Sequence, residues 1–143
     1  MADFRFLLLE PDEARRQYHE HLRPRLEKVR SKTNAPWFVE DVYTSLVEGR
    51  GNAGLFVSGE TVVGIAVVEK ITEPHTNKQG VFIWAAEADS VSGILPYMTE
   101  TWQKLASVWE CSYAEFESNR EGWFKKPRGG WEPVRTVWQK RFD

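Results

Sequence analysis

The sequence has little cysteine, no long apolar run and almost no net charge. Its one cysteine, Cys111, excludes a disulfide within the chain, and a reducing compartment is the simplest expectation. No stretch approaches the roughly 20 apolar residues that span a bilayer. Residues 1–16 lack the basic start and small-residue cleavage site of a secretory signal. We therefore expect a soluble cytoplasmic protein without a membrane partner. The net charge of −2 gives no general attraction to nucleic acid.

The histidines do not form a metal-binding pattern. His19 and His21 fall in a charged helical segment and His75 in a polar loop, with no cysteine or aspartate at ligand spacing. A nucleophilic pair would require Cys111 to meet a distant histidine, and a lone cysteine after a helix is more often buried and inert. We predict no metal site.

Aromatic residues, by contrast, are abundant. Seven tryptophans stand among 143 residues, and most are expected in the core because burying an indole removes a large apolar area from water. A chain of this length can form one domain, over residues 1–143, with a core of its own.

Apolar periodicity predicts the element order β-α-α-β-β-β-α-β-α-β. The predicted strands cover residues 4–11, two segments within 52–71 that turn at Ser58–Gly59, and 79–88, 111–118 and 132–142. The first predicted helix starts at residue 12 and is bent or split at Pro24, and the second starts near Pro36. A long helix covers residues 90–110, with Ser90 or Ser92 as its cap, and a short helix precedes Pro127.

The long helix has the clearest stripe, formed by Ile94, Met98, Trp102, Leu105 and Trp109. Together the elements predict an α+β fold (an α/β sandwich), in which helices flank a mixed, mostly antiparallel central sheet.

This order and one local motif resemble the GNAT N-acetyltransferase superfamily. GNAT proteins commonly carry an asparagine after the fifth strand, a small residue three positions on, and a Gly-Phe-like pair after the next helix. Asn119, Gly122 and Gly130–Trp131 match that spacing. Residues 116–142 look similar to a divergent GNAT-like group often found in bacteriophage genomes, which would place the protein in a host cytoplasm or a virion.

The resemblance implies acetyl-CoA, or another acyl-CoA, and an amine acceptor that is a small molecule or a protein. Backbone N–H groups at the start of the long helix would hold the CoA pyrophosphate, and Asn119 would contact the pantetheine arm. The residues expected at that helix start are Val91, Ser92, Gly93 and Ile94. For the general base we choose Glu87 first, at a strand end where partial burial would suit proton uptake, and Glu69 second.

Two departures from the GNAT pattern favour other functions. Residues 87–98 contain Gly93 in place of a glycine-rich turn, with the acids Glu87 and Asp89 beside it, and Lys126 stands where many GNAT enzymes have a catalytic tyrosine. A noncatalytic GNAT-like protein that binds a host or virion protein is therefore an alternative. A nucleic-acid binder is a weaker one. It would use a basic C-terminal quarter formed by Arg120, Lys125, Lys126, Arg128, Arg135, Lys140 and Arg141.

Overall fold

The computed structural model describes residues 3–33, 36–117, 130–135 and 137–142. Its strands are β1 (Phe4–Leu8), β2 (Asn52–Ser58), β3 (Thr61–Thr72), β4 (Gln79–Ala88) and β5 (Tyr113–Glu115). Its helices are α1 (Pro11–Gln17), the π-helical segment η1 (Tyr18–Leu22), α2 (Arg23–Thr33), α3 (Val39–Val47) and α4 (Ile94–Val108). Among these residues, no helix is long and apolar enough to cross a membrane.

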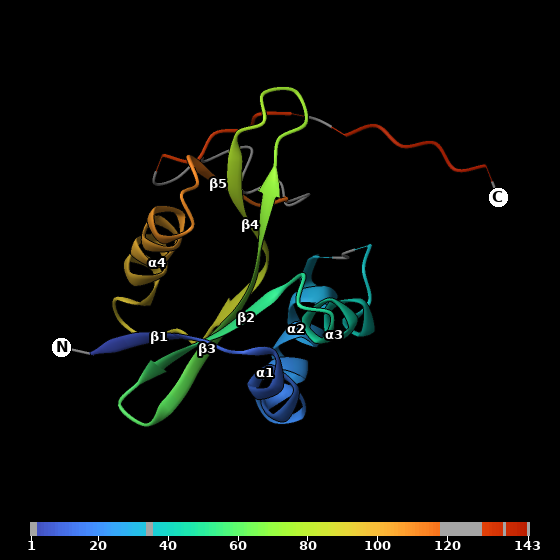
Figure 1. The fold of residues 1–143 in the computed structure, drawn as a ribbon. Helices are drawn as coiled ribbons and strands as arrows, with labels where there is room; N and C mark the ends of the chain where they lie inside the picture. The colour runs from blue at the N-terminus through green and yellow to red at the C-terminus, as the bar shows by residue number, and fades with distance from the viewer. Residues whose placement is uncertain (1–2, 34–35, 118–129, 136, 143) are drawn as a thin grey trace.

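The five strands form one mixed sheet in the order β1-β2-β3-β4-β5. The first four are antiparallel to their neighbours, and β5 is parallel to β4. The parallel pairing requires a crossover connection, which α4 provides on one face of the sheet (Figure 1). The predicted class, a mainly antiparallel sheet flanked by helices, is confirmed.

Helices α1 to α3 cover the opposite face from α4 (Figure 1). Their buried residues meet one side of β2, β3 and β4 in a single cluster, which includes Leu22, Leu26, Val42, Leu46, Leu55, Ile65, Val67 and Ala85. Strand side chains alternate between the two faces, so Ile65 and Val67 of β3 belong to this α1–α3 layer, and Ala66 and Val68 lie on the other face.

The first helical segment is split as Pro24 predicted, but the irregular turn lies before the proline. Pro24 has no N–H to offer the preceding turn. In η1 the Arg23 N–H donates to the Tyr18 carbonyl, the wide spacing of a π-helix. The Tyr18 hydroxyl donates to the Val39 carbonyl at 3.2 Å and ties this segment to α3.

Helix α3 begins at Val39, so the predicted start at Pro36 is wrong. The Asp41 carboxylate accepts a hydrogen bond from the Phe38 N–H at 2.8 Å and thereby fixes the first turn. A side chain that satisfies an N-terminal donor outweighs the preference of proline for the first helical position.

Helix α4 packs its predicted stripe on the second face of the sheet. Ile94, Met98, Trp102 and Leu105 are buried against a cluster that includes Phe56, Ala66, Val68, Val81 and Ile83. Phe56 is fully buried, and its ring lies 6.0 Å from that of Trp102 and 4.8 Å from that of Phe6. The aromatic core thus fixes α4 against the centre of the sheet.

The C-terminal segment differs from the prediction. Residues 132–135 and 137–142 form no strand, and the apolar side chains Val134, Val137, Trp138 and Phe142 are exposed. This part of the chain contacts the end of β5 and the residue after it: Arg135 donates two hydrogen bonds to the Glu115 carboxylate, and the Trp131 ring packs on that of Phe116. The described residues of this alternating segment, 132–135 and 137–142, thus pair with no strand. The predicted short helix before Pro127 lies outside the described residues.

Candidate active site

Strands β4 and β5 pair over a short distance and then separate. Their register joins Gly80, Val81 and Phe82 to Tyr113, Ala114 and Glu115. Beyond Phe82, residues 83–88 of β4 have no strand neighbour on that side within the described part of the chain. At about 3.3 Å per residue, this leaves about 20 Å of strand edge whose outward backbone groups pair with no described strand.

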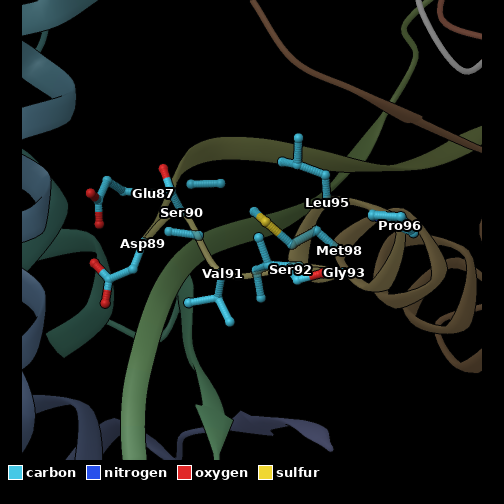
Figure 2. A pocket seen from close by; sticks show the side chains of 12 residues that line it. Glu87, Asp89, Ser90, Val91, Ser92, Gly93, Leu95, Pro96 and Met98 are labelled. Carbon is cyan, nitrogen blue, oxygen red and sulfur yellow. The ribbon is translucent and has the colours of Figure 1, made fainter. Parts of the chain in front are cut away.

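A pocket of about 560 Å³ lies where this edge meets the start of α4 (Figure 2). It is lined by the end of β4, the following turn and the first turns of α4. Five of the predicted site residues come together there: Glu87, Val91, Ser92, Gly93 and Ile94. Asn119 lies outside the described residues. Glu69 does not line this pocket.

The turn before α4 is built on Gly93, which has φ 85° and ψ 0°. The Ile94 N–H donates to the Val91 carbonyl at 3.1 Å across this turn, and those angles at Gly93 match the third position of a type II turn. Gly93 is also the N-cap residue of α4, and no side chain caps the helix. The predicted cap at Ser90 or Ser92 is therefore wrong.

Several backbone donors remain free at this turn. The N–H groups of Ser92, Gly93 and Leu95 donate to no acceptor among the described residues, and Pro96 has no N–H. Those of Val91 and Ile94 are already used within the turn. Free donors at the start of a 15-residue helix favour an anion, because the helix dipole adds to their partial positive charge.

Replacing Gly93 with alanine is expected to lower the free energy of unfolding by about 1–2 kcal/mol, because an L-residue is strained at positive φ. The matched control is Gly59→Ala in the β2–β3 turn, where φ is 62° and no atom lies within 4 Å of an added methyl group. Urea denaturation should show similar losses for both variants. An unchanged Gly93→Ala protein beside a weakened Gly59→Ala protein would contradict the strained-turn geometry.

Arg25 of α2 binds the acidic end of β4. Its guanidinium donates to the Glu87 carboxylate at 2.6 Å and to both carboxylate oxygens of Asp89 at 3.1 and 3.2 Å. It also donates to the carbonyls of Val62 and Val63 on β3. The side chains of Arg25 and Glu87 are 16% and 13% exposed, so water screens this ion pair less than a surface pair.

This cluster changes the electrostatics that the sequence suggested for the turn. Burial opposes the charged form of Arg25, but its hydrogen bonds to Asp89 and Glu87 outweigh that effect and raise its pKa. Figure 2 shows both carboxylates extending away from Ser92 and Gly93. The acids therefore do not face the free N–H groups, and one guanidinium offsets part of their charge.

Glu69 lies elsewhere, at the point where β4 and β5 separate. It pairs in register with Phe82, which in turn pairs with Glu115 of β5. Glu69 follows Val67 by two residues, so it lies on the face of the sheet that α1–α3 cover. It is half-buried and has no hydrogen-bond or ion-pair partner among the described residues.

Trp84 is a feature of this region that sequence reasoning missed. Val67 pairs with Ala85 and Val68 with Ile83, so Trp84 is the extra residue of a β-bulge. Its ring packs edge-on against Trp37 at 6.1 Å, in the α1–α3 layer. No sequence signal marks a bulge within an apolar run.

The other candidate groups take no part in this arrangement. Cys111 is half-buried and its Sγ lies 3.7 Å from the Trp109 carbonyl oxygen. The described residues contain no group of three histidine, cysteine or acidic side chains that could hold a metal ion.

Comparison with known proteins gives matches among solved structures. No protein-family model matches the sequence, and no curated protein matches it. A ribosomal-protein-alanine N-acetyltransferase from Brucella melitensis biovar Abortus superposes with a TM-score of 0.72 at 15% identity, over 97% of this chain and 99% of that one. A GNAT family acetyltransferase from Staphylococcus aureus gives 0.65 at 13% identity, over 99% and 100% of the two chains.

A third match is an aminoglycoside acetyltransferase from an uncultured soil metagenomic sample. It gives a TM-score of 0.64 at 11% identity, over 96% of this chain and 97% of that one. The chain has the GNAT acetyltransferase fold. The predicted GNAT resemblance is thus confirmed for the fold. These three structures, from two bacteria and a soil sample, give no support to the bacteriophage-type group.

Proposed function

We propose that this chain is an N-acyltransferase, which moves an acetyl or other acyl group from acyl-CoA to an amine. One observation carries the proposal: an edge of β4 that pairs with no described strand runs from the N–H groups before α4, which no described residue uses, to the point where β4 and β5 separate, one strand away from Glu69. An extended ligand with an anionic end and a reactive end matches that layout. The GNAT fold, whose solved examples include named acetyltransferases, supports the same function.

The residues at the start of α4 fit the pyrophosphate of CoA. Ser92, Gly93 and Leu95 offer N–H donors that no described residue uses, and the Glu87 and Asp89 carboxylates extend away from them. Val91 and Ile94, whose N–H groups are used within the turn, would contribute pocket wall rather than hydrogen bonds. Asn119 is proposed to contact the pantetheine arm. The acyl thioester supplies an activated carbonyl when bound, and an unpaired N–H on the β4 edge would donate to its oxygen.

The same geometry separates the roles of the two glutamates. Glu87 sits at the phosphate end of the edge, and its carboxylate is engaged by Arg25. Glu69 lies on β3, one strand from the edge, at the level where β4 and β5 separate and on the sheet face opposite α4; it has no partner among the described residues. An amine approaching from that face would meet Glu69, so Glu69 is the better candidate for removing its proton. This reverses the order expected from the sequence.

The acceptor is proposed to be a primary amine of a small molecule or a protein. The structural matches named above include an enzyme of each kind, one for a ribosomal protein and one for aminoglycosides. Trp84 and Trp37 would form one apolar wall on the acceptor side.

Isothermal titration calorimetry with acetyl-CoA tests the first half of this proposal. We expect saturable binding at micromolar to low millimolar concentration, and no binding of equal strength for adenosine. The second half is tested by incubating the protein and acetyl-CoA with a panel of amines and weighing the products by mass spectrometry. Absence of acetyl-CoA binding at millimolar concentration would refute the function.

A further inference from the structure

We infer that Arg25 is a positioning residue for the proposed cofactor turn, which holds the acids at the end of β4 away from the pyrophosphate of CoA. The inference rests on the proposed acyltransferase function and adds a specific residue to it. Arg25 lies on α2, across the sheet from α4, and nothing in its local sequence marks it as part of a cofactor site.

The contacts of Arg25 connect three elements at one point. Its guanidinium binds Glu87 and Asp89 from β4 and the adjoining turn, and the Val62 and Val63 carbonyls from β3. The Asp89 N–H donates in turn to the Val63 carbonyl at 2.7 Å. Asp89 is therefore fixed through both its side chain and its backbone.

Asp89 is hydrogen-bonded to the turn, so its position affects the position of the turn. The Val91 N–H donates to the Asp89 carbonyl at 2.8 Å, and the Val91 carbonyl accepts the bond that closes the turn at Ile94. A displaced Asp89 would therefore move the residues that present the free N–H groups. The two hydrogen bonds from the Arg25 guanidinium to the Asp89 carboxylate restrict both the distance between the groups and the rotation of the carboxylate.

The charge balance at this end of the sheet also depends on Arg25. Two carboxylates and one guanidinium leave a net charge of −1 in the cluster, and removal of Arg25 would leave −2. Glu87 and Asp89 line the same pocket as Ser92 and Gly93. Salt screens charges fully only beyond roughly 8 Å to 10 Å, so carboxylates that turned toward the N–H groups would act on a bound anion. The released carboxylates would also be free to rotate toward the N–H groups.

The test compares Arg25→Met with the wild type for two ligands, CoA and pantetheine, by calorimetry. Pantetheine lacks the pyrophosphate and the nucleotide. We expect Arg25→Met to lower the affinity for CoA about 10-fold or more, because one uncompensated unit charge near an anion has an effect of this order. The affinity for pantetheine should not change. In the triple variant Arg25→Met, Glu87→Gln, Asp89→Asn, which removes both negative charges, CoA affinity should recover.

Equal losses of affinity for CoA and pantetheine, or no recovery of CoA affinity in the triple variant, would overturn the proposed role of Arg25 in holding the two carboxylates. Should Arg25→Met fail to fold, Glu87→Gln, Asp89→Asn in the presence of Arg25 provides the second test. That variant is expected to bind CoA more tightly than the wild type and pantetheine with the same affinity. An unaltered CoA affinity would refute the inference. Failure of the wild type to bind CoA at all would refute the proposed function instead, so the two failures are distinguishable.

Discussion

Glu69→Gln is expected to lower kcat/KM for acyl transfer about 100- to 10,000-fold, the usual contribution of a general base. The amide keeps the size of the side chain and loses its ability to accept a proton. Glu69 is half-buried on β3 at the level where β4 and β5 separate, and no ion pair with a described residue competes for its carboxylate. Steady-state kinetics with the amine that the panel identifies would measure the loss.

Two matched variants make this prediction specific. Glu60→Gln, in the exposed turn between β2 and β3, should leave the kinetics unchanged. Glu87→Gln should lower kcat much less than Glu69→Gln, because the Glu87 carboxylate is engaged by Arg25. Binding of acetyl-CoA should be the same in Glu69→Gln and the wild type. If Glu69→Gln keeps more than one-tenth of the activity, Glu69 is not the base.

Phe56→Ala is expected to lower the free energy of unfolding by about 3–5 kcal/mol, the cost of removing a large aromatic side chain from a packed core. Phe56 is fully buried, and its ring is in contact with Phe6, Tyr97 and Trp102. Two of these rings belong to α4, so the cavity would open directly beneath the helix that carries the proposed cofactor turn. Chemical denaturation gives the change, provided that the m value is unaltered.

Val108→Ala, on the helix α4 that covers Phe56, is the control. Val108 is 76% exposed, and its truncation should change the free energy of unfolding by no more than about 0.5 kcal/mol. A loss below about 1 kcal/mol for Phe56→Ala would mean that α4 is not held by this aromatic cluster. Acetyl-CoA affinity measured under conditions where Phe56→Ala remains folded would show how far the turn depends on the packing beneath it.

Local patterns in the sequence predicted most of the elements. The stripe from Ile94 to Leu105 predicted a helix with one buried face, and that face covers the sheet. The apolar run of residues 79–88 predicted a strand, and β4 has the same bounds. These predictions succeed because helical and strand periodicities depend on neighbours a few residues apart.

Other local signals failed where a tertiary contact or an alternative cap was stronger. Pro36 does not start α3, because the Asp41 side chain fixes the first turn at Phe38. The alternation in residues 132–142 predicts a strand, yet a strand forms only when a sheet edge supplies partners, and none pairs with the described residues of this segment.

The sequence by itself determined the order of the elements from β1 to β5 and the presence of glutamates in β3 and β4. Only the tertiary structure decided what those glutamates can do. Arg25 and Glu87 are 62 residues apart in the chain, and their 2.6 Å contact depends on how α2 packs on the sheet. The place of Glu69 beside the separation point depends on the register of β3, β4 and β5. Ion pairs and registers join distant segments, and local periodicity carries no information about which distant segments meet.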